Sequence, residues 1–63
     1  MNVKINGNCT GTLVKYGQTV ESATVSLFTG DTVEYLGVCH DGTTLVRVRS
    51  NTYKVPSQFI QYE

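Results

Sequence analysis

The stretch 30-GDTVEYLGVCHDGTTLVRV-48 decides the fold. Two runs in which apolar and polar residues alternate flank the short segment 39-CHDG-42. Alternation with a period of two is typical of a strand with one buried face. An Asp-Gly pair supplies the backbone geometry that a hairpin connection requires. The stretch therefore predicts a β-hairpin that packs one face against a core.

A second hairpin is predicted immediately downstream, from 44-TLVRVRS-50 and 53-YKV-55. A tight turn at Asn51–Thr52 places Arg49 opposite Lys54 and keeps one face apolar and the other cationic. Asn tolerates the positive φ of such turns, although Thr is a poorer second residue than Gly. The pattern predicts that four valines point toward one core: Val33, Val46, Val48 and Val55.

The rest of the chain also indicates short strands. The segments 11-GTLVKYG-17 and 24-TVSLF-28 predict two strands around a polar loop, 17-GQTVESA-23. Near the end, 56-PSQF-59 predicts one turn of 3₁₀ helix, and Ile60 begins a brief last strand. No stretch favours an α-helix, because the longest candidate is rich in Thr, Val and Ser. The predicted fold class is all-β, a small five-stranded barrel.

Size and composition indicate one small domain over residues 1–63. The chain is 40% hydrophobic and carries five acidic and five basic residues, so its net charge is zero. That balance argues against nucleic-acid binding driven by bulk charge, and it leaves little repulsion against self-association. The chain starts with Met and shows no signal-peptide or membrane-helix pattern, so we expect a complete cytoplasmic polypeptide with no membrane partner.

Candidate residues for catalysis and metal binding are sparse. In a cytoplasmic setting Cys9 and Cys39 are predicted to be small buried thiols, with a disulfide as the second interpretation and a metal site as the last. One His and two Cys cannot fill a tetrahedral zinc shell. His40–Asp41 lies in a predicted hairpin loop, where neighbouring side chains rarely pair for catalysis. We therefore expect neither an enzyme nor a cofactor.

The order of these elements resembles the Src-homology-3 (SH3) family of small β-barrels over about residues 12–62. Leu13–Tyr16 stand where that family opens its long loop, and Leu27–Phe28 precede a turn at Thr29–Asp31 as they do there. Pro56-Ser57-Gln58-Phe59-Ile60 matches the family's late turn. The resemblance implies five strands with a long loop after the first. Residues 2–8 fall outside it and are expected to add an N-terminal edge strand, through which a homo-oligomer could form.

The resemblance also implies a groove of aromatic rings that binds proline-rich peptides. Here Val14 replaces the first tyrosine, Thr43 takes the place of the tryptophan, and the loop acids are reduced to Glu21. The proline-peptide groove is thus incomplete. We predict instead a non-catalytic module that binds another protein, such as a phage- or bacterium-encoded adaptor or inhibitor. Its predicted contact residues are Tyr16, Thr43, Pro56, Phe59 and Tyr62.

A basic strand face offers a different function. The predicted register puts Arg47, Arg49 and Lys54 together, with Lys15 near them. Such a face, with tyrosines close by, can hold a nucleic-acid backbone. A solvated face that Glu34 partly neutralises is the competing interpretation.

Overall fold

Seven β-strands make up most of the chain in the computed structural model, which describes residues 1–62. Within that range there is no α-helix, so the predicted all-β class is confirmed. In chain order the elements are β1 (Asn2–Ile5), β2 (Cys9–Lys15), β3 (Gln18–Leu27), β4 (Thr32–Val38), β5 (Thr43–Val48), β6 (Asn51–Pro56), the 3₁₀ turn η1 (Ser57–Phe59) and β7 (Ile60–Gln61).

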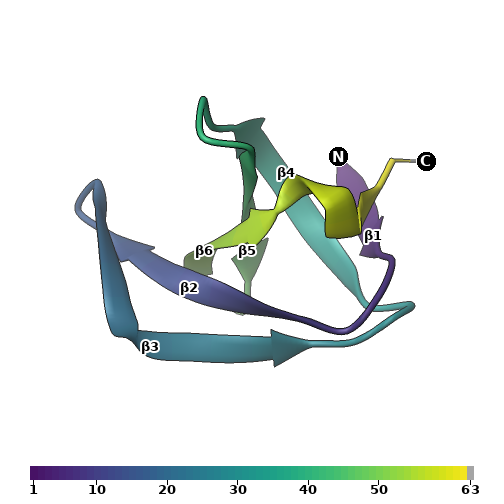
Figure 1. Cartoon of the computed structure of the whole chain (residues 1–63), viewed down its shortest axis with the longest axis horizontal. Coiled ribbons are helices and arrows are strands. Elements are labelled where there is room, and N and C mark those ends of the chain that lie inside the picture. The colour runs from purple at the N-terminus through teal and green to yellow at the C-terminus, as the bar shows by residue number, and fades with distance from the viewer. Residues whose placement is uncertain (63) are drawn as a thin grey trace.

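The strands form one antiparallel sheet in the order β3-β2-β6-β5-β4-β1-β7. Figure 1 shows that this sheet is strongly curled, so that β2 and β3 lie across the concave side from β1 and β4. Strands β3 and β7 are its two edges, and no ladder joins them among residues 1–62. The connection at residues 39–42, the turn η1 and the short last strand are all confirmed where the sequence predicts them.

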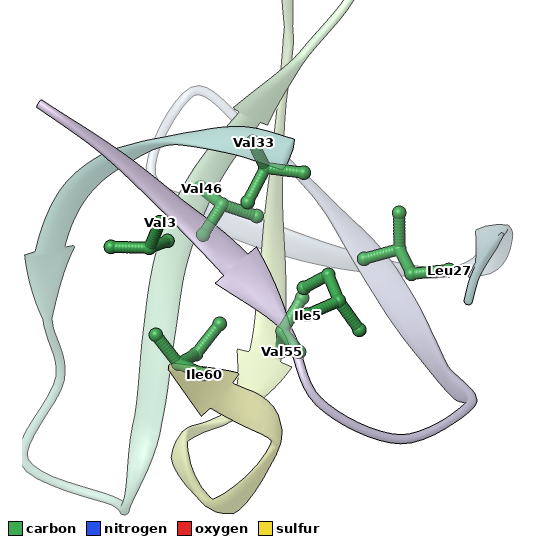
Figure 2. Close-up of a cluster of buried hydrophobic side chains, with 7 residues drawn as sticks. All are labelled: Val3, Ile5, Leu27, Val33, Val46, Val55 and Ile60. Carbon is green, nitrogen blue, oxygen red and sulfur yellow. The ribbon is translucent and has the colours of Figure 1, made fainter. Parts of the chain in front are cut away.

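The core consists of aliphatic side chains from every strand except β2 (Figure 2). They converge on the concave side and are Val3, Ile5, Leu27, Val33, Val46, Val55 and Ile60. Three of the four valines predicted to point inward are buried, and the fourth, Val48, is half-buried against the same cluster. One polar residue, Thr44, is also buried, and its hydroxyl lies 2.8 Å from that of Ser57. This hydrogen bond satisfies a polar group that burial would otherwise destabilise.

The N-terminal strand does not lie at an edge, so that prediction is wrong. β1 pairs with β4 through Val3↔Val33 and with β7 through Ile5↔Ile60. Both apolar residues of β1 are almost completely inaccessible to solvent. Strand β1 thus lies between two sheet neighbours, β4 and β7. β7 pairs with Lys4 and Ile5, so that part of β1 has no free edge for self-association.

The predicted polar loop 17-GQTVESA-23 is also wrong, because β2 and β3 form a hairpin with a tight turn at Tyr16–Gly17. These two residues have φ of 54° and 77°. Positive φ at both central positions is the signature of the type I′ turn, which matches the twist of the flanking strands. The pairing slips from Thr12↔Thr24 to Leu13↔Val20, so residues 21–23 form an irregularity within β3.

The turn between β5 and β6 lies two residues earlier than predicted. Arg49 and Ser50 occupy it with φ of 52° and 78°, and the ladder pairs Val46 with Tyr53 and Thr44 with Val55. The predicted turn at residues 51–52 is wrong, and so are the pairs that depend on it. Because the shift is an even number of residues, Val46 and Val55 keep their predicted inner face, and Arg47 and Lys54 keep their outer one.

Candidate functional site

The basic strand face is largely neutralised by carboxylates. Arg47 and Glu34 are cross-strand partners on β5 and β4, and one guanidinium nitrogen lies 2.7 Å and 2.8 Å from the two carboxylate oxygens. The ammonium of Lys54 lies 2.9 Å from a carboxylate oxygen of Asp41. The sequence interpretation in which Glu34 offsets the cations is confirmed for Arg47.

The remaining two predicted basic residues lie near turns. The ammonium of Lys15 is 5.7 Å from the centre of the Tyr16 ring, at a distance where a cation and an aromatic ring attract. Arg49 lies in the β5–β6 turn and has no carboxylate within ion-pair distance among residues 1–62. Arg47 and Lys54 therefore form ion pairs on the outer face, whereas Lys15 and Arg49 lie at turns.

Asp41 organises the β4–β5 loop. One carboxylate oxygen accepts hydrogen bonds from the backbone N–H and the hydroxyl of Thr43, at 3.3 Å and 2.6 Å, and the other accepts from Lys54. The Thr43 hydroxyl, followed by Lys54, lowers the pKa of Asp41 from 3.8 to about 2. The same contact with Asp41 raises the pKa of Lys54. Thr43, a predicted protein-contact residue, is therefore engaged in holding its own loop.

Acid should weaken the fold through Asp41. Since its pKa falls on folding, the ionised carboxylate stabilises the native state above about pH 4, and this contribution is lost as the pH falls through about 2. We expect Asp41→Asn to lower the free energy of unfolding at about pH 6 and to lose that difference progressively toward about pH 2. Urea unfolding of both proteins across this range measures the effect. A difference that stays constant with pH would contradict it.

The residues predicted to contact a protein partner do not all lie together. Thr43 and Pro56 are cross-strand partners at the end of β6, and Phe59 is half-buried against the core with its ring close to Gly7. Tyr16 is 93% exposed at the β2–β3 turn. Because β2 pairs with the beginning of β6, through Val14↔Thr52, Tyr16 lies at the opposite end of β6 from Pro56.

The fifth predicted residue, Tyr62, belongs to a cluster that we call the aromatic end: Met1, Tyr35, Val38 and Tyr62. The rings of Tyr35 and Tyr62 meet edge to face with their centres 5.6 Å apart, and the Tyr35 N–H donates to the Met1 carbonyl at 2.8 Å. Val38 pairs with the buried Thr44 yet is 62% exposed. Met1 and Tyr62 are 71% and 51% exposed.

Two residues of the aromatic end lie on β4, and the other two lie one residue outside β1 and β7. Met1 alternates with Val3, Tyr35 with Val33, and Tyr62 with Ile60, and those three partners are core residues. A β-bulge at Leu36 shifts the register so that Val38 also lies on this face. Met1, Val38 and Tyr62 are exposed, whereas Tyr35 is half-buried and packs against the core. Sequence reasoning selected Tyr62 as a contact residue and did not select Met1, Tyr35 or Val38.

A pocket of about 270 Å³ lies at the other end of β4 and β5. Its apolar lining comes from Val25, Leu27, Val48 and Tyr53, and its polar lining from Ser26, Asp31, Arg49 and Asn51. One oxygen of Asp31 accepts a hydrogen bond from the Phe28 N–H at 2.9 Å, as expected for a residue that stabilises its turn. The pocket was not predicted, because it depends on β3 reaching the β5–β6 turn.

The described residues contain no group of three or more His, Cys, Asp or Glu arranged to hold a metal ion. Cys9 and Cys39 are free thiols, half-buried rather than fully buried as predicted. Burial, with a smaller effect of Asp31, raises the pKa of Cys9 and keeps it protonated. His40 is exposed in the β4–β5 loop.

Across residues 1–62 the structure has no helix of the length and hydropathy that crossing a membrane demands.

Comparison with known proteins returns no match: no family model, curated protein or solved structure shows significant similarity to the chain.

Proposed function

We propose that this chain is a non-catalytic module that binds another protein through its aromatic end. One observation carries the proposal: Met1, Val38 and Tyr62 expose apolar side chains at this end, and the Tyr62 ring meets that of the half-buried Tyr35. Exposed apolar groups that lie singly are normal on a protein surface, whereas a contiguous group indicates an interaction site. The four side chains come from both ends of the chain and from β4, so only the folded protein presents them together.

The chemistry of the aromatic end suits protein recognition. Tyrosine carries a large apolar area at little cost in side-chain entropy, and it is enriched among residues that dominate binding energy. Thr43 and Pro56 lie at the same end of β5 and β6 and extend the surface onto the outer face. The proposed site therefore keeps three of the five residues selected from the sequence and adds Met1, Tyr35 and Val38.

An SH3-like arrangement is the architecture that we propose for the curled sheet. Its support is the hairpin over residues 39–42 and the 3₁₀ turn η1 that leads directly into β7. The chain departs from that arrangement at Tyr16–Gly17, where a tight turn replaces the long loop. Without that loop, a polyproline groove lacks one wall.

Nucleic-acid binding has no comparable support. Arg47 and Lys54 already interact with Glu34 and Asp41, and these carboxylates would repel a phosphate backbone.

Two tyrosines permit a matched test of the proposal. Tyr62→Asn should weaken binding to a protein partner about 30-fold or more, the effect of losing a central anchor worth about 2 kcal/mol. Tyr16→Asn should leave binding unchanged, because Tyr16 lies at the far end of β6 and asparagine tolerates its positive φ. Immobilised wild type and both variants would be compared by quantitative capture from lysate, followed by titration with each purified partner.

Circular dichroism would first establish that both variants fold. Partners that bind wild type and Tyr62→Asn equally would refute the proposal, as would equal losses for both variants. Sedimentation at several concentrations provides a further test. A dimer of the chain alone that Tyr62→Asn dissociates would show that a second copy, rather than another protein, covers the aromatic end.

A further inference from the structure

Strand β3 is a long edge with one unpaired side. It extends over ten residues, Gln18–Leu27, and its one neighbour among residues 1–62 is β2. In an antiparallel pair the backbone groups of alternate residues point away from the partner. Part of the N–H and C=O groups of β3 are therefore directed at solvent. The opposite edge, β7, has two residues and offers little to pair with.

The edge of β3 lacks most of the features that prevent pairing with other chains. Natural edges are protected by lysine, proline, bulges or short length. β3 contains no Lys, Arg or Pro, and Glu21 is its one charged residue. Its irregularity is confined to residues 21–23. The segment Thr24–Leu27 beyond it keeps a regular register with β2 and is uncharged.

The pocket lies beside this regular segment. Val25 and Leu27 contribute to its lining, so the face of β3 that they occupy is the face that looks into the pocket. A strand that paired with β3 would place its residues directly opposite those of β3, on the same face. Every second side chain of such a strand would therefore enter the pocket.

Arg49 and Asp31 give the pocket one positive and one negative group. Arg49 lines it and has no carboxylate partner among residues 1–62. Asp31 accepts a hydrogen bond from the Phe28 N–H, but its carboxylate would repel another carboxylate, so the acidic side chain of an occupant must lie on the Arg49 side of the pocket. A carboxylate on the incoming strand would supply the partner that Arg49 lacks, while apolar neighbours would contact Val25, Val48 and Tyr53.

We propose that β3 binds an extended segment of another protein as an additional strand, with alternating apolar and acidic side chains in the pocket and a carboxylate on Arg49. Main-chain hydrogen bonds supply affinity in this mode of recognition, and the pocket supplies specificity. The site is separate from the aromatic end, because the two lie at opposite ends of β4 and β5. Strand binding at β3 can therefore be tested independently of protein binding at the aromatic end.

Synthetic peptides test the charge requirement. The probe is Thr-Val-Thr-Glu-Thr-Val-Thr, whose valines and glutamate share one face of a strand, and its control carries Lys in place of Glu. Titration followed by amide NMR should shift the signals of residues 24–27 and Arg49. The Glu peptide should bind about tenfold more tightly than the Lys peptide. Arg49→Glu should reverse that preference, whereas Lys15→Glu, at an exposed cation outside the pocket lining, should preserve it.

Backbone methylation of the probe tests the pairing itself. Two versions carry N-methyl groups on alternate amides, one for each edge of the peptide. One version should lose binding and the other should retain it, because a strand pairs with β3 through one edge. Equal binding of both versions, equal binding of the Glu and Lys peptides, or the absence of shifts at millimolar peptide would overturn the proposal.

Two further measurements separate this site from other interpretations. Tyr62→Asn should bind the Glu peptide as wild type does, whether or not the substitution weakens protein binding at the aromatic end. Signals of residues 24–27 that shift with protein concentration alone would show that a second copy pairs with β3, which would also overturn the proposal.

Discussion

Ile5→Ala should unfold most of the protein at 25 °C. Ile5 is 1% exposed and lies in a strand held between β4 and β7. Truncating a buried isoleucine to alanine costs about 2–5 kcal/mol, through lost burial and the cavity that remains. A single core in a chain of this size rarely supplies more than about 3–5 kcal/mol. The substitution therefore removes most or all of the stability, which urea unfolding followed by circular dichroism would measure.

Leu36→Ala is the matched control, because it removes the same number of carbon atoms from a side chain that is largely outside the core. Its cost should stay below about 1 kcal/mol, as is usual for exposed positions. If Ile5→Ala and Leu36→Ala were equally stable, β1 would not contribute to the core, and the interior place of this strand would be wrong.

Gly7→Ala should be the most damaging of the glycine substitutions, with a cost of about 3 kcal/mol or more. Gly7 connects β1 to β2 with a φ of 108°, which side chains rarely adopt. A Cβ at this position would lie 2.9 Å from Cδ1 of Phe59. The substitution thus combines backbone strain with a clash against a ring that packs on the core. Thermal and urea unfolding would measure the loss.

Gly30→Ala separates these two causes. Gly30 has a φ of 95°, and a Cβ there meets nothing within 4 Å. The loss of stability on its substitution therefore comes from backbone strain alone. Gly30→Ala should cost about 1–2 kcal/mol. Phe59→Leu in the Gly7→Ala background should recover part of the stability that the clash removes. A double-mutant cycle would quantify this recovery. Equal effects at Gly7 and Gly30 would indicate that the Phe59 ring moves aside freely.

Much of the aromatic end could not be predicted because exposure depends on where the sheet stops. Alternation correctly assigns Tyr35 to the face of Val33, and it implies burial for both. The structure buries Val33 fully, whereas Tyr35 is half-buried against the core and its ring meets that of the exposed Tyr62. The ion pairs of Arg47 and Lys54 are a similar case. Glu34 was identified as a neutralising neighbour, but Asp41 reaches Lys54 only after the β4–β5 loop folds back.

The sequence by itself determined most of the strands, the connection at residues 39–42 and the face on which Val33, Val46 and Val55 lie. These features depend on local chemistry: alternation with a period of two, and an Asp-Gly pair that permits a tight connection. If the pairing register between two strands shifts by an even number of residues, each side chain stays on the same face of the sheet. This is why Val46 and Val55 are buried although their predicted partners were wrong.

Only the tertiary structure decided which even register is adopted, which residues turn, and which strand lies inside the sheet. The turns at Tyr16–Gly17 and Arg49–Ser50 use residues that carry little turn preference apart from Gly17. They are selected because the resulting registers bring Val46, Val55 and the two apolar residues of β1 into one core. Contacts between residues distant in the chain set that choice, and the free energy of burying them together exceeds the local preferences that a single segment expresses.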